Sequence, residues 1–140
     1  MMLKILIVDD ENDAIEALEW KLNRYLNDIV IEKCNSPIEA ISVVETFQPD
    51  IVFLDIHMPA MNGFEFLTNL KHLKFNLIFT TAYDDMAIRV SRLTDIFYIL
   101  KPVDKDDLLE VFEKAKLKGK DGYLEQKITF LKQHLLDYTS

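Results

Sequence analysis

The apolar run at residues 51–54, Ile-Val-Phe-Leu, constrains the fold of this chain more than any other stretch. Such a run is too short for a helix and is typical of a strand that is buried on both faces. It ends in a single carboxylate, Asp55, and Pro59 and Gly63 predict an irregular connection before the next helix. Because chemistry in open α/β sheets gathers outside the C-terminal ends of the strands, the residues at the other strand ends decide what Asp55 can do.

Further short runs have the apolar or alternating character of strands. They are Leu3–Val8, Ile29–Cys34, residues 77–79 and Phe97–Leu100, of which Ile29–Cys34 carries two charges, as an edge strand does. Helical spacing of apolar residues between the runs predicts helices at 14–26, from 36 onward, at 64–73, at 84–93 and at 104–116. Strands and helices thus alternate, which predicts an α/β domain with a doubly wound parallel sheet. We place this domain at residues 1–118 and a linker with a helical extension at 119–140.

The second helix has a strong start signal. Ser36 can act as the N-cap, Pro37 stands at the first helical position and Glu39 completes a capping box. We expect the buried stripe of this helix to contain Ile38, Ile41 and Val44.

The composition restricts the function. The chain has 16 Lys and Arg against 24 Asp and Glu, a formal net charge of −8, which argues against nucleic-acid binding by this segment on its own. The single cysteine, Cys34, excludes an internal disulfide and suits a reducing compartment. Apolar runs are too short to span a membrane and the N-terminus lacks the pattern of a signal peptide, so we expect a cytoplasmic protein with no membrane partner.

Polar residues stand at the C-terminal ends of most of the expected strands. Asp9 and Asp10 follow the first strand, Asp55 the third, Thr81 the fourth and Lys101 the fifth. In a sheet with strand order 2-1-3-4-5, the first and third strands are neighbours, and the fourth and fifth lie alongside. The three carboxylates would then meet, with a hydroxyl and an ammonium beside them.

These residue types together suit phosphoryl transfer. Adjacent carboxylates cannot all stay ionised unless a cation lies among them, and Mg²⁺ prefers oxygen ligands and bridges to phosphates. Lys101 and Thr81 can neutralise and bind the oxygens of a phosphoryl group. Asp55 can then act as a carboxylate nucleophile and form an acyl phosphate.

The same residues, in this order, resemble the receiver domain of two-component response regulators. The resemblance covers about residues 2–118 and depends on several short motifs that are weak singly and specific together. They are Asp9-Asp10, Asp55 followed by Met58-Pro59 and Gly63, Thr81-Ala82, and Tyr98 before Lys101-Pro102. The resemblance implies the flavodoxin-like (βα)5 fold with strand order 2-1-3-4-5. It also implies a protein that is not an enzyme, apart from its own phosphorylation and dephosphorylation.

By resemblance, Asp55 is the phosphoacceptor and receives its phosphoryl group from a phosphohistidine of a sensor histidine kinase. Asp10 and Asp55 bind Mg²⁺ with the backbone carbonyl of His57, and Asp9 acts through a water molecule. Lys101 pairs with the phosphoryl group, and its peptide bond to the following proline is usually cis in the family. The ring of His57 is expected to face solvent and at most to tune the lifetime of the phosphoryl group.

The resemblance also assigns a switch and an output surface. Thr81 moves toward the phosphoryl group and Tyr98 swings inward behind it, although a strand aromatic can also be a plain core residue. The output surface is formed by residues 84–93, 97–100 and 104–116, and it is a candidate homodimer interface. Within it, residues 94–96 read Thr-Asp-Ile where many receivers have Gly-Ala, a departure that touches the partner surface and not the site.

A break at residues 118–122 precedes a last amphipathic segment. Its apolar residues alternate in spacings of four and three, as in a coiled-coil seam: Leu124, Ile128, Leu131, Leu135 and Tyr138. So short a helix needs a partner, which can be its own domain, a second copy through the 123–138 helix, or a further domain.

Residues 79–85 and 98–103 resemble receivers that precede LytTR-type DNA-binding domains. We therefore expect a receiver from a longer transcription regulator, which contacts DNA only through an output domain absent from this chain. The alternative is a stand-alone receiver that acts by protein–protein binding.

Two other functions fit the residues less well. A phosphotransferase of the haloacid-dehalogenase type needs a second acid two residues after the nucleophile, where this chain has His57. A flavodoxin-like cofactor binder needs a hydroxyl- and glycine-rich phosphate loop after the first strand, where residues 9–13 are mostly acidic.

Overall fold

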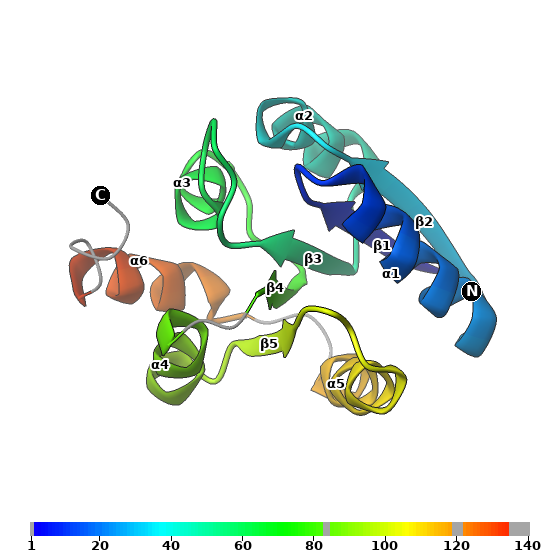
Figure 1. The fold of residues 1–140 in the computed structure, drawn as a ribbon. Coiled ribbons are helices and arrows are strands. Elements are labelled where there is room, and N and C mark those ends of the chain that lie inside the picture. The colour runs from blue at the N-terminus through cyan, green and yellow to red at the C-terminus, as the bar shows by residue number, and fades with distance from the viewer. Residues whose placement is uncertain (1, 83–84, 119–121, 135–140) are drawn as a thin grey trace.

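The computed structural model describes residues 2–82, 85–118 and 122–134, and within them five parallel strands form one sheet with the order β2-β1-β3-β4-β5 (Figure 1). The strands are β1 (Leu3–Val8), β2 (Ile29–Cys34), β3 (Ile51–Asp55), β4 (Asn76–Thr81) and β5 (Phe97–Leu100). The helices are α1 (Asn12–Tyr25), α2 (Pro37–Phe47), α3 (Gly63–Thr68), α4 (Asp85–Thr94), α5 (Lys105–Lys118) and α6 (Leu124–His134). The expected fold class and strand order are confirmed. None of the described helices has the length and apolar character needed to cross a membrane.

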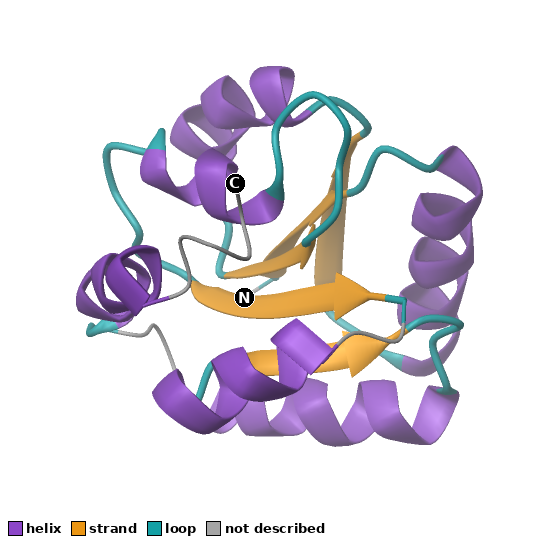
Figure 2. Ribbon diagram, turned by 60° about the vertical axis from the view of Figure 1, so that its left-hand side comes forward, coloured by secondary structure: helices purple, strands orange, loops and turns teal. Residues whose placement is uncertain are grey.

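Side chains of each strand alternate between the two faces of the sheet and build a buried cluster on each face. On one face, Val52 and Leu54 of β3 pack under α2, α3, α4 and α6. On the other face, Ile51 and Phe53 pack under α1 and α5. Figures 1 and 2 show these two helical layers on either side of the sheet. Every residue of β3 is buried, as the apolar run predicts.

The N-cap and the first-turn proline of α2 are as expected, but between the described residues Ser36 and Glu39 only one of the two hydrogen bonds of the predicted capping box is formed, and one residue of the predicted buried stripe is misplaced. Ser36 Oγ accepts a hydrogen bond from the backbone N–H of Glu39 at 3.3 Å, with Pro37 at the first turn. Ile38, however, is 62% exposed, so its predicted burial is wrong. The helix turns Pro37, Ala40 and Val44 inward, and Ile38, one residue further round from Pro37, points to solvent. Val44 is buried as expected.

The helix α3 is shorter than the expected helix at 64–73. It starts with a complete capping box, in which Asn62 and Glu65 exchange hydrogen bonds of 2.9 and 3.2 Å between side chain and backbone. It ends at Thr68 because Asn69 caps it: the Asn69 side chain donates to the carbonyl of Glu65 at 2.7 Å. The strand β4, in contrast, is longer than the expected 77–79, since the polar residues at both of its ends also pair with neighbouring strands.

The helix α6 packs on the core of its own domain. Leu124, Ile128 and Leu131 are only 1%, 4% and 1% exposed and belong to the buried cluster under α2, α3 and α4. Both ribbon views place α6 between α3 and α4 (Figures 1 and 2). Of the three partners considered for this amphipathic segment, its own domain is the one observed. Leu135 and Tyr138, the other members of the predicted stripe, lie outside the described residues.

The departure from the Gly-Ala pattern at residues 94–96 has a local explanation. Asp95 has a φ of 61°, the left-handed conformation that ends α4 and that glycine adopts most easily. Thr94 supports this turn, because its hydroxyl donates to the carbonyl of Val90 at 2.7 Å and accepts from the N–H of Ile96 at 3.3 Å. The chain therefore makes the same kind of helix end with a hydroxyl cap and an aspartate.

We expect Asn76→Ala to lower the free energy of unfolding by about 1–3 kcal/mol. The buried Asn76 side chain donates to the carbonyl of Ala115 at 2.8 Å, and this carbonyl lies in the last turn of α5, where helical carbonyls lack partners within the helix. Urea unfolding followed by circular dichroism measures the loss. The matched control Asn23→Ala, on the exposed side of α1, should change stability by less than about 0.5 kcal/mol. An equal effect of both substitutions would contradict the cap.

Candidate functional site

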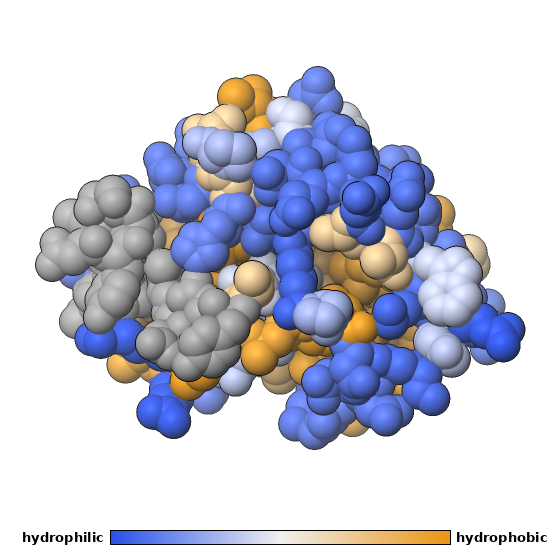
Figure 3. All heavy atoms as spheres, in the orientation of Figure 1, coloured by the Kyte–Doolittle hydropathy of each residue, from blue (hydrophilic) through white to orange (hydrophobic). Residues whose placement is uncertain are grey.

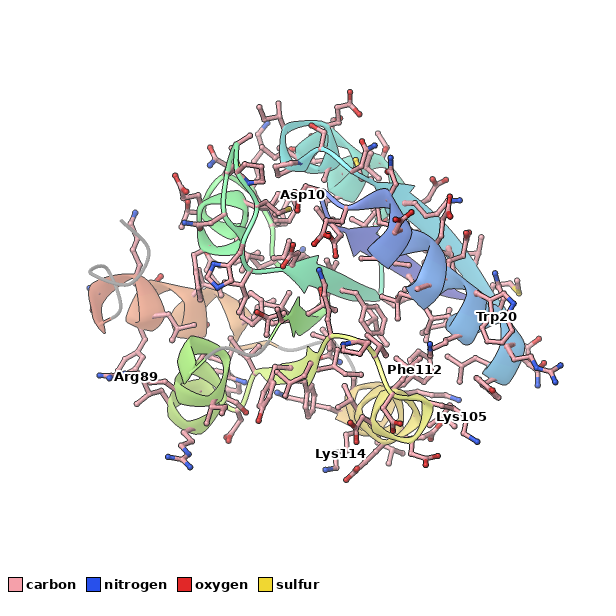
Figure 4. All side chains as sticks on the ribbon, viewed as in Figure 1. Asp10, Trp20, Arg89, Lys105, Phe112 and Lys114 are labelled. Carbon is pink, nitrogen blue, oxygen red and sulfur yellow. The ribbon has the colours of Figure 1, made fainter. Side chains whose placement is uncertain are left out.

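The acids expected at the strand ends meet at one edge of the sheet. Asp9 directly follows β1 and Asp55 is the last residue of β3, and these strands pair with Val8 opposite Leu54. One carboxylate oxygen from each of four acids lies within 4.8 Å of the others; the acids are Asp9, Asp10, Glu11 and Asp55. Figure 4 shows Asp10 at this edge, and the surface seen from the same side is mainly hydrophilic (Figure 3).

Glu11 belongs to this group, although we predicted no role for it. Its side chain is 68% exposed and its carboxylate lies 3.8 Å from Lys101 Nζ. The sequence does indicate that Glu11 could join the site, because Glu11 continues the acidic run after β1. The run alone does not show, however, that the chain turns so that the third acid faces the same cation as the first.

Lys101 is the cation among these acids. It follows β5, and its backbone N–H donates to the carbonyl of Thr81 at 2.7 Å, which extends the pairing of β4 with β5 beyond the last strand residue. Its Nζ lies 2.7 Å from Asp9 Oδ2 and 3.5 Å from Asp55 Oδ2. The peptide bond from Lys101 to Pro102 is cis, as the family resemblance implies. The strand ends therefore bring the predicted lysine and two of the predicted acids into contact.

Backbone N–H groups fix the orientation of the two buried carboxylates. The N–H of Glu11 donates to Asp9 Oδ1 at 3.0 Å, and the N–H of His57 donates to Asp55 Oδ1 at 3.2 Å. Each carboxylate thus uses Oδ1 for the backbone and turns Oδ2 toward Lys101. This arrangement holds Asp55 Oδ2 beside a positive charge, where an incoming anionic group would also be attracted.

The surroundings of Asp55 disfavour its charged form. Burial, the charge of Asp9 and the charge of Asp10 raise the pKa of Asp55 from 3.8 to about 7, although Lys101 and the N–H of His57 act in the opposite direction. Asp55 is only 3% exposed. A group at this position that adds positive charge would remove the penalty and leave an ionised carboxylate.

The ammonium of Lys101 stays protonated in this environment. Burial lowers its pKa, but the hydrogen bond with Asp9 and the charges of Asp55, Asp9 and Glu11 outweigh burial, so that the pKa of Lys101 is raised. Lys101 is therefore a permanent positive charge at the site and not a proton donor near neutral pH.

Thr81 closes the site from β4. It is fully buried, and within the described part of the chain its Oγ1 has no hydrogen-bond partner. An unpartnered buried hydroxyl costs free energy, and it is available to donate to a group that enters the site. The predicted role of Thr81 as a donor to a phosphoryl oxygen stays a prediction.

His57 follows β3 by two residues, and Tyr98 lies in β5, three residues before Lys101. His57 is exposed, as expected. Tyr98 is partly buried, packs against the cluster beneath α2, α3, α4 and α6, and lines a cavity of about 470 Å³ formed by α4, β5 and α5. Its position suits both roles considered for it, a core residue and a residue that moves.

Comparison with known proteins agrees with this geometry. Residues 5–113 match the response regulator receiver domain family. The chain belongs to this family. Receivers of this family interact with histidine kinases and bind Mg²⁺ at an acidic pocket.

Individual relatives are longer proteins. The chain is 37% identical over 128 residues to the sensory transduction protein LytT of Bacillus cereus, which covers 90% of this chain and 52% of that protein. It is 37% identical over 106 residues to the transcriptional regulatory protein BtsR of Escherichia coli, covering 74% of this chain and 44% of that protein. The chain thus spans about half the length of these curated relatives. A two component transcriptional regulator AraC from Clostridium phytofermentans, solved as a crystal structure, is 28% identical with a TM-score of 0.64, over 96% of this chain and 98% of that chain.

The donors of this receiver fit a hard divalent cation. Four carboxylates converge within 4.8 Å, and oxygen ligands of this kind suit Mg²⁺. Burial and the charges of Asp9 and Asp10 raise the pKa of Asp55 even with Lys101 in place. A cation between Asp10 and Asp55 would favour the ionised carboxylate.

Glycine at position 63 allows the helix α3 to begin directly against the end of β3. A Cβ on Gly63 would lie 2.8 Å from the carbonyl oxygen of Asp55 and 3.2 Å from Cα of Ile56. The N–H of Gly63 also donates to the carbonyl of Ile56 at 2.8 Å. A side chain here must displace backbone atoms of the residue that carries the buried carboxylate.

We expect Gly63→Ala to lower the free energy of unfolding by about 1–3 kcal/mol, because the contacted atoms belong to the backbone and cannot yield cheaply. Gly122→Ala is the matched control, since a Cβ at Gly122 meets nothing within 4 Å. The control should leave stability unchanged or raise it by about 0.5 kcal/mol. Urea unfolding of both variants measures the difference, and equal stabilities would show that the backbone accommodates the methyl group.

In EDTA, the stability of the wild type should fall relative to Asp55→Asn as the pH rises from 4 to 8. Because the folded-state pKa of Asp55 is about 7 against 3.8 for an ordinary aspartate, the folded protein holds this proton more tightly than the unfolded chain does. Stability is thus retained below pH 4 and lost as the pH rises through 7, by about 2–4 kcal/mol. Urea unfolding at each pH measures the difference, and a difference that does not depend on pH would contradict the raised pKa.

Proposed function

We propose that Asp55 is the phosphoacceptor of this receiver and takes its phosphoryl group from a phosphohistidine of a sensor histidine kinase. The observation that carries the proposal is a buried Asp55 carboxylate whose Oδ2 lies 3.5 Å from Lys101 Nζ, at the same strand edge as Asp9 and Asp10. An oxygen of Asp55 attacks phosphorus, the bond from phosphorus to the histidine nitrogen breaks, and the nitrogen keeps the electron pair. The product is an acyl phosphate on Asp55 and a free histidine on the kinase.

The acids would hold Mg²⁺ during this step. Asp10 and Asp55 would bind it directly with the backbone carbonyl of His57, and Asp9 would act through a water molecule. When bound, Mg²⁺ neutralises the acids and the phosphoryl oxygens. Asp9 has a second task, because its 2.7 Å contact with Lys101 Nζ keeps the lysine at the site.

Lys101 and Thr81 complete the binding of the phosphoryl group. The charge that develops on its oxygens meets the Lys101 ammonium, which stays protonated for the reasons given above. The Thr81 hydroxyl gains the partner that it lacks within the described structure. Thr81 then moves toward the group and Tyr98 follows inward, so that the new charge biases the surface formed by α4, β5 and α5.

The biological output that we propose is control of transcription through an output domain that follows the receiver. This proposal is supported by the names of relatives such as the transcriptional regulatory protein BtsR, of which this chain covers 44%. Residues 1–118 would form the receiver and 119–140 its connection, with DNA contacted only by the further domain and with dimers formed through α4, β5 and α5 or through α6. The alternative is a stand-alone receiver that acts by binding another protein.

Incubation with acetyl phosphate tests the chemistry without the kinase. We expect the intact mass of the wild type to increase by one phosphoryl group in the presence of Mg²⁺ and not in EDTA, and the group to be released by hydroxylamine, as an acyl phosphate is. The control Asp55→Asn keeps the size of the side chain but removes the nucleophilic oxygen, so it should show no mass increase.

Two results would overturn this assignment. A folded wild type that stays unmodified with Mg²⁺ would mean that the domain works without phosphorylation. A phosphoryl group that persists in Asp55→Asn would place the acceptor at another residue.

A further inference from the structure

The helix α6 fills a groove of this receiver with a single apolar stripe. Leu124, Ile128 and Leu131 are buried, whereas Glu125, Gln126, Thr129, Lys132 and Gln133 are exposed. The helix has 11 residues, and isolated helices shorter than about 12–15 residues are marginal in water. Its order therefore depends on how well the stripe fits the groove between α3 and α4.

The groove is built from elements that the proposed switch would move. Val90 of α4 and Ile96 before β5 are 1% and 2% exposed and belong to the same buried cluster as the α6 stripe. Thr81 is the last residue of β4, and α4 is the next element in the chain, so a shift of Thr81 toward Asp55 would pull on α4. The wall of the groove that α4 provides would follow.

Tyr98 acts on the same cluster from β5. It is partly buried and packs against the cluster that contains the α6 stripe. Protein cores are close-packed, so an aromatic ring that moves further inward needs volume that another group must give up. The strands are held together by backbone pairing in the sheet, whereas α6 is held by its apolar stripe, so we take α6 as the element that yields.

We propose that α6 is an intramolecular output helix of this domain, bound in the α3–α4 groove when Asp55 is unmodified and released when Asp55 carries a phosphoryl group. The proposal depends on the phosphorylation of Asp55 proposed above. Release exposes the stripe of Leu124, Ile128 and Leu131, while the sheet and the remaining helices stay folded. The docked helix in turn opposes phosphorylation, because coupling between two sites is reciprocal.

Hydrogen exchange followed by mass spectrometry tests the release in the full chain. Beryllofluoride with Mg²⁺ serves as a stable, non-covalent substitute for the phosphoryl group on Asp55. We expect amides of α6 to exchange about tenfold faster with beryllofluoride, while amides of α2 stay unchanged, because local opening of one element leaves the others protected. Asp55→Asn should show no change in α6.

The reciprocal effect is tested with Ile128→Ala, which weakens the stripe away from the site. This variant should exchange faster in α6 without beryllofluoride and should bind beryllofluoride severalfold more tightly than the wild type by isothermal titration calorimetry. The matched control Gln126→Ala, on the exposed side of α6, should leave both quantities unchanged. If Ile128→Ala does not fold, hydrogen exchange of the wild type with and without beryllofluoride still tests whether α6 is released.

The outcomes separate the two proposals. If the wild type takes up a phosphoryl group from acetyl phosphate and binds beryllofluoride, but α6 exchanges at the same rate, the release of α6 is wrong and the phosphoacceptor stands. If the wild type does neither, the phosphoacceptor assignment fails and the release of α6 fails with it.

Discussion

The burial of the Asp55 carboxylate beside Asp9 is an unfavourable contact that the rest of the fold has to maintain. Burial and repulsion by Asp9 disfavour the charged form of Asp55, and Lys101, which both carboxylates contact, compensates only in part, so that the pKa of Asp55 is raised to about 7. A divalent cation among these acids would favour their ionised forms and would make the approach of an anionic group more favourable.

The fold maintains this unfavourable arrangement because the pairing of the strands fixes the positions of the residues at their ends. β1 and β3 are packed on both faces, and their register places Val8 opposite Leu54, which sets the distance between the carboxylates that follow. The continued pairing of Lys101 with Thr81 sets the position of the lysine in the same way. The stability of the apolar core therefore holds the charged groups together.

The sequence predicts the parts of this structure that depend on pattern. Short apolar runs define β1, β3 and β4, and the polar residues that end them define most of the site, because parallel strands deliver their C-terminal residues to one edge. It does not predict features that depend on a particular tertiary neighbour. Ile38 and Ala40 both fit a helical stripe, but Ala40 is the one fully buried, and the 3.6-residue period does not say which side faces the sheet. Glu11 was missed for a related reason, since the turn after β1 decides which acids converge.

The position of α6 also depends on a tertiary neighbour that the sequence pattern does not identify. A four-three spacing of apolar residues is equally typical of a coiled-coil seam and of a helix on a globular core, so the sequence leaves its partner open. The structure explains why α6 packs on the globular core. The helix α3 ends at Thr68, and α6 lies beside this short helix. It contributes three buried residues to the cluster that contains Phe66 and Leu67. A helix that is too short to be stable alone thus completes a core whose other walls are α4 and the strand that carries Tyr98.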